Sequence, residues 1–198
     1  MRLFNYVRDA VALCVVFSGL WLGNAAVGDV ITVPTGLSVG DQYRLVFISS
    51  TFHNALSSDI STYNSIVDAL GDTAIASDWK VIGSTATVDA IDNTATPIAT
   101  SGVSIWRLDG VQVADNYADL WDGSLDADIS TRETGGTVGG SFGGSFNFVW
   151  TGTETDGRKK GNDLELGSVG KVQQGDADPF AGTRGYMVDA TILGSGPG

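Results

Sequence analysis

The stretch "VSIWRLDGVQVAD" (103–115) has a strand–turn–strand pattern on which the fold prediction is based. Two short segments rich in β-branched and aromatic residues flank the dipeptide Asp109-Gly110, which suits a two-residue type I′ turn. The stretch therefore predicts a β-hairpin made of two short antiparallel strands.

A helix is predicted upstream of the hairpin, at "SSDISTYNSIVDALG" (57–71). Its apolar residues recur at helical spacing: Ile60, Tyr63, Val67 and Leu70. Ser57 or Ser58 is expected to cap the N-terminus, with Asp59 in the first turn near the positive end of the helix dipole. Gly71 is expected just after the last turn, where it can adopt a positive φ.

Further strands are predicted at 39–51, 77–85, 147–153 and 184–193. In the first of them, Tyr43, Leu45 and Phe47 alternate toward one side. Polar or glycine-rich segments between the strands are expected to be irregular loops: 85–102, 135–146 and 154–167.

The composition fits one domain of short elements joined by many turns. The chain has 198 residues, of which 42% are apolar, 17% are charged and 27 residues are glycine. Low charge argues against disorder, and the alternation of strands and loops with one clear helix (about 58–70) predicts an α+β fold with short antiparallel strands and long irregular loops.

The N-terminus has the layout of a secretory signal peptide. "MRLFNYVR" carries Arg2 and Arg8, "AVALCVVFSGLWLG" is an apolar run of the right length, and small residues follow it. We therefore expect residues 1–28 to be a signal peptide and residues 29–198 to form a single extracellular domain. An uncleaved N-terminal anchor is the alternative.

Charge and residue counts exclude several classes of function. The net charge of −12 makes nucleic acid an unexpected partner. Cys14 lies in the signal segment and His53 is the single histidine, which leaves no cysteine nucleophile, multi-histidine zinc site or CxxC pair in the exported domain. A serine triad at His53 is not expected, because no strand-to-helix nucleophile elbow accompanies it. The basic "GRKKG" (157–161) is expected to be solvated and to pair locally with Asp156 and Asp163, and docking of an acidic polysaccharide there is the minor alternative.

Several segments together resemble exported bacterial proteins of the PEP-CTERM type. The matching segments, in order, are "YRLVFISST", "DISTYNSIVDAL", "DWKVIGSTATVDAIDN", "VADNYADLWDGSLDADI" and "VWTGTETDG", spanning roughly 39–167. The resemblance implies export and retention at the cell surface, not an activity. Because the sequence stops at "TILGSGPG" without a Pro-Glu-Pro motif, apolar span or basic tail, we expect that the C-terminal sorting segment is missing from it. The alternative is that this member of the group lacks the signal. Membrane attachment is expected only through the signal segment or that missing anchor.

A more distant resemblance concerns the fold. The helix, the "W-K" segment, "VSIWRLDGVQVADNYADLWDG" and "VWTGTETDGRK" occur in the order seen in endostatin-like domains, which implies a C-type-lectin-like fold. The chain departs from those domains in having no cysteine after the signal segment to form their disulfides. The lectin tripeptides Glu-Pro-Asn and Gln-Pro-Asp are also absent, so the resemblance does not by itself imply sugar binding.

An aspartate cluster around "ADLWDGSLDAD" (118–128) is the main candidate site; its members are Asp115, Asp119, Asp122, Asp126 and Asp128. Carboxylate oxygens suit calcium, although the spacing is not that of an EF-hand. The predicted ligands are Asp119, Asp122, Asp126 and Asp128. In the alternative interpretation, Asp122-Gly123 forms a turn, Trp121 packs inward and the other carboxylates face water. A glycosidase-type carboxylate pair is a third reading.

Other loops offer further candidate ligands. Three residues following a predicted strand would either complete the cation site or serve as turn residues: Asp89, Asp92 and Asn93. Four aromatic residues would either stack on sugar rings or pack in the interior: Trp106, Tyr117, Phe142 and Phe146. Of these, Trp106, Phe142 and Phe146 are the predicted ligand-binding residues.

The sequence thus favours a non-catalytic, exported binding or structural module of the cell surface or extracellular matrix. Its expected ligand is an extracellular polysaccharide or matrix component, with an accessory calcium site. Two alternatives stay open: a hydrolase that acts on extracellular polysaccharide through aspartate carboxylates, and a structural matrix protein with no discrete ligand.

Overall fold

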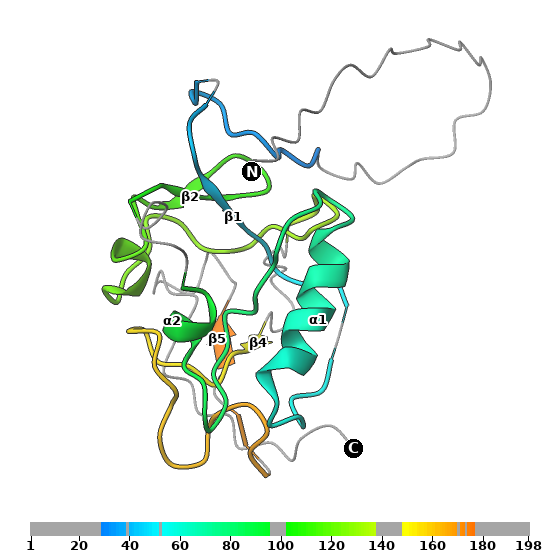
Figure 1. The fold of residues 1–198 in the computed structure, drawn as a ribbon, viewed down its shortest axis with the longest axis vertical. Helices are drawn as coiled ribbons and strands as arrows, with labels where there is room; N and C mark the ends of the chain where they lie inside the picture. Colours follow the sequence, from blue (N-terminus) through cyan, green and yellow to red (C-terminus); the bar gives the residue numbers. More distant parts are fainter. Residues whose placement is uncertain are drawn as a thin grey trace, which may run out of the picture.

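The computed structural model describes residues 29–38, 40–51, 53–95, 102–137, 148–169, 171–172 and 174–176. Within these ranges the protein is a mixed α+β structure with few helices, a small three-stranded sheet, a two-stranded sheet and much irregular chain (Figure 1). None of the described helices is long and apolar enough to cross a membrane. The predicted signal segment, Phe142, Phe146 and the strand predicted at 184–193 lie outside the described residues.

The predicted hairpin is formed by β2 (Ile105–Arg107) and β3 (Gln112–Ala114), which pair antiparallel. Its turn is not the predicted type I′ turn. The Arg107 and Val111 backbones pair around a three-residue loop, and Gly110 alone in that loop has a positive φ, of 80°. The extra loop residue is Leu108, whose side chain is completely buried. A three-residue loop ending in a left-handed glycine is a common hairpin connection, and here it allows an apolar loop residue to enter the core.

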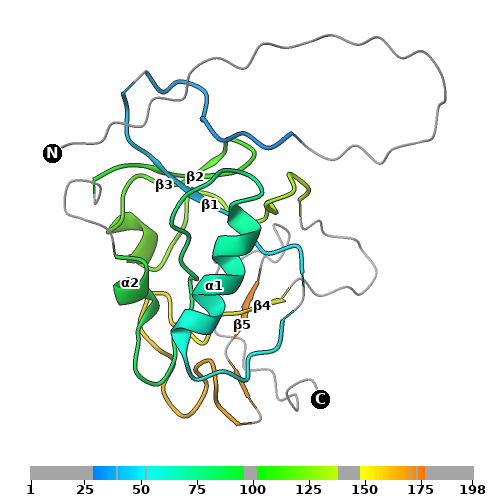
Figure 2. The same cartoon turned by 45° about the vertical axis from the view of Figure 1, so that its right-hand side comes forward.

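The expectation of purely antiparallel strands is wrong for the third strand of this sheet. β1 (Arg44–Val46) pairs parallel to β2, so that the strand order is β1-β2-β3. A parallel pair requires a long crossover connection. The chain between the two strands supplies it, because it includes both α-helices. Figure 2 shows the sheet toward one end of the molecule and the second sheet toward the other.

The buried side of β1 is also not the one that the alternation indicated. Val46, which lies out of phase with Tyr43, Leu45 and Phe47, is the strand residue buried in the core. The opposite side is nevertheless covered, since the Phe47 ring meets the Trp79 ring edge-on at 5.0 Å between centroids. The strand therefore has apolar contacts on both sides, and simple alternation cannot identify the inner one.

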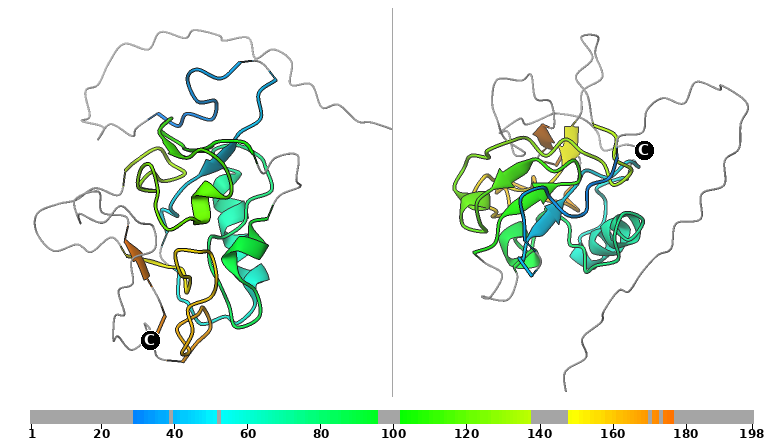
Figure 3. Two further views of the ribbon diagram at one scale, coloured as in Figure 1. Left: turned by 90° about the vertical axis from the view of Figure 1, so that its left-hand side faces the viewer. Right: turned by 90° about the horizontal axis from the view of Figure 1, so that it is seen from above.

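The predicted helix is confirmed as α1 (Ile60–Gly71), which lies on the β1 side of the sheet (Figure 3). Its N-cap is Asp59 rather than Ser57 or Ser58. The Asp59 carboxylate accepts hydrogen bonds from the Ser61 backbone N–H at 2.9 Å and the Ser61 hydroxyl at 2.8 Å. The backbone hydrogen bond, with the hydroxyl second, lowers the pKa of Asp59 below its ordinary value.

Gly71 ends α1 for a reason that differs from the prediction. It is the last helical residue and does not have a positive φ. Instead, a Cβ at this position would lie 2.6 Å from three atoms of the Trp79 ring. Trp79 is fixed there by two hydrogen bonds. Its ring Nε1 donates to the Ile75 carbonyl, and its backbone N–H donates to the Asp68 carboxylate. Glycine is needed at this position for space.

The strand predicted at 77–85 is wrong. In the middle of the segment, side-chain amides bind the backbone: the Val81 N–H donates to Asn64 Oδ1, and the Val81 carbonyl accepts from Asn93 Nδ2. Only its last residues pair with other backbone, through Ser84 hydrogen bonds to Thr151 and Leu166 and an isolated bridge at Thr85. Asn93 belongs to α2 (Ala90–Asn93), a short helix within the segment predicted to be irregular. Local side-chain hydrogen bonds of this kind compete with the sheet ladder for backbone groups.

The second sheet pairs β4 (Phe148–Trp150) antiparallel with β5 (Gln174–Asp176), which confirms the strand predicted at 147–153. Two apolar clusters stabilise the structure. One lies under the three-stranded sheet and includes Trp121; the other joins α1 to the chain that follows β4, through contacts that include Tyr63 and Leu166.

Candidate functional site

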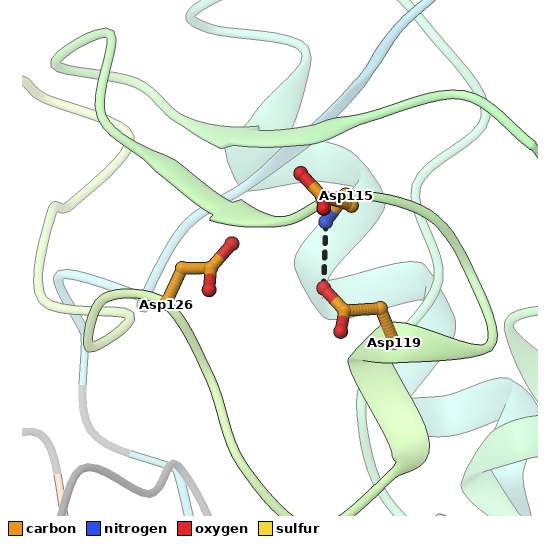
Figure 4. Close-up of side chains that lie close together, drawn as sticks. All are labelled: Asp115, Asp119 and Asp126. Carbon is orange, nitrogen blue, oxygen red and sulfur yellow. Dashed lines mark hydrogen bonds between the residues drawn. The ribbon is translucent and has the colours of Figure 1, made fainter.

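Three aspartates from the predicted cluster converge at the end of the hairpin (Figure 4). Asp115 directly follows β3, Asp119 begins the 3₁₀ helix η1 (Asp119–Trp121), and Asp126 lies in the loop that returns toward β3. One carboxylate oxygen of each lies within 4.8 Å of the others, close enough to hold one metal ion. We call these residues the aspartate triad.

Backbone hydrogen bonds around the triad explain its shape. The Asp115 N–H donates to the Asp119 carboxylate at 2.7 Å. Asn116 Oδ1 accepts from the N–H groups of Ala118 and Asp119, at 2.9 and 3.1 Å, which tightens the turn into η1. The Asp126 N–H donates to the Val113 carbonyl, which fastens the returning loop to β3.

Burial beneath the triad anchors the same segment. Leu120, Trp121 and Leu125 are at most 6% exposed and belong to the core cluster under the sheet. Asp115 and Asp126 are exposed, whereas Asp119 is half-buried. The triad therefore lies on the surface of a segment whose apolar side chains are packed in the core.

The chemistry of the triad favours a cation. Three carboxylates lie together, and none of them forms an ion pair with a lysine or arginine of the described chain. Mutual repulsion of like charges is relieved when a cation binds between them. Asp115 is additionally fixed by Gln112, whose amide donates to it at 2.7 Å.

Two of the predicted ligands, Asp122 and Asp128, are not part of the triad. The Asp122 carboxylate accepts from the N–H and hydroxyl of Ser124, at 2.9 and 3.1 Å, and Gly123 next to it has a φ of 102°. Asp128 accepts a hydrogen bond from Arg107 through its backbone carbonyl. Asp122-Gly123 thus forms the turn of the alternative interpretation, and Trp121 packs inward as that interpretation expected. Asp115, which belongs to the predicted cluster but was not among the predicted ligands, completes the triad instead.

The second acidic segment does not reach the triad. Asp89 is the N-cap of α2, and its carboxylate accepts the Lys159 N–H at 2.8 Å. Asn93 exchanges two amide hydrogen bonds with Asn64, at 2.8 and 2.9 Å. Both residues have the local structural roles that were the alternative for this segment, and Asp92 lies beside them in the same short helix.

Of the two aromatic candidates within the described residues, neither projects freely. Trp106 is half-buried and donates from Nε1 to the Ser104 hydroxyl at 2.7 Å. The Tyr117 hydroxyl donates to the Ile91 carbonyl and contacts Thr94, and its ring faces the Arg44 guanidinium at 4.9 Å. Burial lowers the pKa of Arg44, partly offset by Tyr117.

The basic loop is neutralised locally, as predicted for Asp156. Arg158 lies 3.6 Å from the Asp156 carboxylate, and Lys160 lies 2.6 Å from Glu154. Lys159 is exposed, and its Nζ donates to the Ala86 carbonyl. His53, the single histidine, is exposed and contacts the Thr51 hydroxyl at 2.7 Å.

Asn116 is the residue of the candidate site that the sequence analysis missed. It stands between two triad members and orders the turn through its side chain. The signal was present in the sequence, because an asparagine that precedes a short apolar helical turn commonly caps it. A comparison with models of known protein families finds no match, and a comparison with curated proteins finds no relative of this chain.

Proposed function

We propose that the protein is an exported, non-catalytic binding or structural module of the cell surface or extracellular matrix, of C-type-lectin-like type, that carries a calcium ion on the aspartate triad. The observation that supports this proposal is the convergence of three carboxylates within 4.8 Å at the end of the hairpin. Export and surface location rest on the N-terminal segment and on the resemblance to PEP-CTERM proteins. The ligand is an extracellular polysaccharide or a matrix component, recognised by loops on a rigid scaffold.

The donor set selects calcium among common metals. All three candidate ligands are carboxylates, which suit hard cations rather than zinc or copper. Two of the three are exposed, so water can complete the six to eight oxygen ligands that calcium takes. Magnesium, by contrast, prefers a strict octahedron and retains most of its own water.

The same geometry favours cation binding over glycoside hydrolysis. Hydrolysis needs two carboxyl groups on opposite sides of a sugar-sized cleft, about 5 to 9.5 Å apart. One carboxylate oxygen of each triad residue lies within 4.8 Å of the others, so the three groups gather around one point on the surface, as a cation requires. A turnover assay on extracellular polysaccharides would distinguish the two functions, because a binding module releases no product.

Thermal melting in calcium, in magnesium and in chelator tests the cation site. Extracellular calcium sites have Kd values of about 10⁻⁴–10⁻³ M. Calcium at about 10 to 100 times Kd stabilises a folded protein by about 1.4–2.7 kcal/mol. For a domain of this size each kcal/mol raises Tm by about 2–4 °C.

Asp126→Asn is the informative variant. The Asp126 side chain makes no hydrogen bond within the described residues, so removing its charge leaves the fold intact while weakening the site. Asp122→Asn is the matched control, since it removes one carboxylate from the same loop but outside the triad. We expect the calcium-dependent rise in Tm to disappear in Asp126→Asn and to persist in Asp122→Asn. A wild-type protein that melts at the same temperature in calcium and chelator would refute the site.

A further inference from the structure

A second surface feature lies beside the triad, where α2, η1 and the loop after β4 meet. It is an open groove of about 580 Å³. Six side chains that define its chemistry are Ile91, Asn116, Tyr117, Ala118, Trp121 and Asp156. Its volume is in the range of small-molecule sites, and its surface is largely apolar.

The groove is held in shape by contacts between its three segments. The Tyr117 hydroxyl donates to the Ile91 carbonyl, and the Ile91 N–H donates to the Gly157 carbonyl at 3.0 Å. Gly157 has a φ of 79°, and a Cβ there would lie 2.7 Å from the Trp121 ring, so the loop backbone lies against the indole. The Tyr117 and Trp121 rings meet edge-on, 6.1 Å apart between centroids. Such a pre-formed surface binds without a large ordering cost.

Asn116 and Asp156 supply the groove with one hydrogen-bond donor and one acceptor. Asn116 uses its Oδ1 in the turn, while its Nδ2 has no hydrogen-bond partner within the described part of the chain. The Asp156 carboxylate accepts the Arg158 N–H at 3.0 Å and has lone pairs left for a further donor. A ligand that fits must therefore combine an apolar face with groups that both accept and donate hydrogen bonds.

Charge restricts the ligand further. An anion would be repelled by Asp156 and by the neighbouring triad. A cationic ligand would have to replace Arg158, which lies 3.6 Å from the Asp156 carboxylate. It would also be repelled by the Arg44 guanidinium, which faces the Tyr117 ring. A neutral ligand meets neither obstacle.

We propose that this groove binds a neutral sugar ring of an extracellular polysaccharide. A pyranose has an apolar face of C–H groups, which matches Tyr117 and Ile91, and a rim of hydroxyls that accept from Asn116 and donate to Asp156. The inference rests on the proposed binding function and deepens it by naming the ligand class and its position. It places sugar recognition at Tyr117, the fourth aromatic candidate, and not at the predicted ligand-binding residues Trp106, Phe142 and Phe146.

Titration calorimetry with two neutral probes, maltohexaose and cellohexaose, tests the groove. We expect at least one of them to bind the wild-type protein with a Kd of about 1 mM or lower. Ala118→Leu should weaken binding about tenfold or more, because the exposed Ala118 lines the groove and a larger side chain would fill it. Ala69→Leu makes the same change at an exposed position of α1 and should bind as the wild type does.

Three results would overturn the proposal: no binding of either probe at about 10 mM, equal binding by Ala118→Leu and wild type, or preference for polygalacturonate or hexalysine over the neutral probes. Each titration is run on protein whose calcium response has been measured by melting. Loss of sugar binding with a normal calcium response refutes the groove alone. Sugar binding without a calcium response refutes the cation site and leaves the groove.

Discussion

Replacement of Gly71 by alanine sets helix propensity against packing at the end of α1. In an exposed helix interior, glycine to alanine stabilises by about 1 kcal/mol. At Gly71 the added methyl group would lie 2.6 Å from Cδ1, Cδ2 and Cε2 of Trp79, well inside van der Waals contact. Two effects of opposite sign thus act at one residue, and their sizes decide the outcome.

The structure indicates that packing prevails. Trp79 is 9% exposed, its ring abuts Phe47, and its Nε1 and backbone N–H are both hydrogen-bonded. The ring therefore cannot move aside without breaking several contacts. Overpacking of such a site costs about 1–3 kcal/mol, and helix propensity offsets at most about 1 kcal/mol at a helix end. We expect Gly71→Ala to lower the free energy of unfolding by about 1 kcal/mol, equivalent to about 2–4 °C in Tm.

Urea unfolding followed by circular dichroism measures this effect, with Gly136→Ala as the control. No atom lies within 4 Å of a Cβ at Gly136, and its φ is not positive, so that variant should remain within about 0.5 kcal/mol of wild type. A double-mutant cycle isolates the clash: in a Trp79→Leu background, Gly71→Ala should become neutral or stabilising. A Gly71→Ala protein with a higher urea midpoint than wild type would refute the reasoning.

One half-buried carboxylate, Asp109, and one buried carboxylate, Glu133, give the remaining predictions. Burial raises the pKa of Asp109, but hydrogen bonds from Arg107 and the charge of Arg107 outweigh it, and the net pKa is lowered. Asp109 therefore stabilises the protein above its unfolded pKa of about 3.9, and this contribution is lost as pH falls through the lower folded value. In urea unfolding measured over a series of pH values, Asp109→Asn should lower the free energy of unfolding by about 1–3 kcal/mol at pH 7 and by nearly nothing at the acid end. A difference that does not change with pH would contradict the ion pair. Glu133 is 3% exposed, and its carboxylate accepts hydrogen bonds from the N–H and hydroxyl of Ser50. Glu133→Ala should lower the free energy of unfolding by about 1–3 kcal/mol in the same assay. An unchanged urea midpoint would show that this contact does not hold the two segments together.

The sequence predicted those elements that depend on neighbouring residues. The apolar spacing of 57–71 identified α1, and Asp109-Gly110 identified the hairpin, because both signals are local. The parallel pairing of β1 with β2 depends on a crossover through two helices and leaves no local mark. The strand predicted at 77–85 failed for a related reason, because the hydrogen-bond partners of Val81 are side chains distant in sequence.

The candidate cation site was also predicted only in part, and here a local rule could have improved the prediction. Asp122 is followed two residues later by Ser124, and this spacing allows the carboxylate to accept the serine N–H and close its own turn. Asp126 has no such neighbour and remains available. Asp115 and Asp119 are four residues apart, with Asn116 supplying the turn between them, so the Asp115 N–H reaches the Asp119 carboxylate. An aspartate whose carboxylate accepts both the N–H and the hydroxyl of a serine two residues later is a poorer candidate ligand than one without such a serine.

The position of Asn116 also links the two proposed sites. Its Oδ1 orders the turn that carries the triad, and the same residue lines the groove beside Tyr117. A cation that holds Asp115 and Asp119 in place would restrict the same turn and reduce the ordering cost of sugar binding at Asn116. By thermodynamic linkage, a bound sugar would then raise the affinity of the triad for calcium by the same factor. One short segment would thus couple cation binding to recognition without any larger movement of the fold.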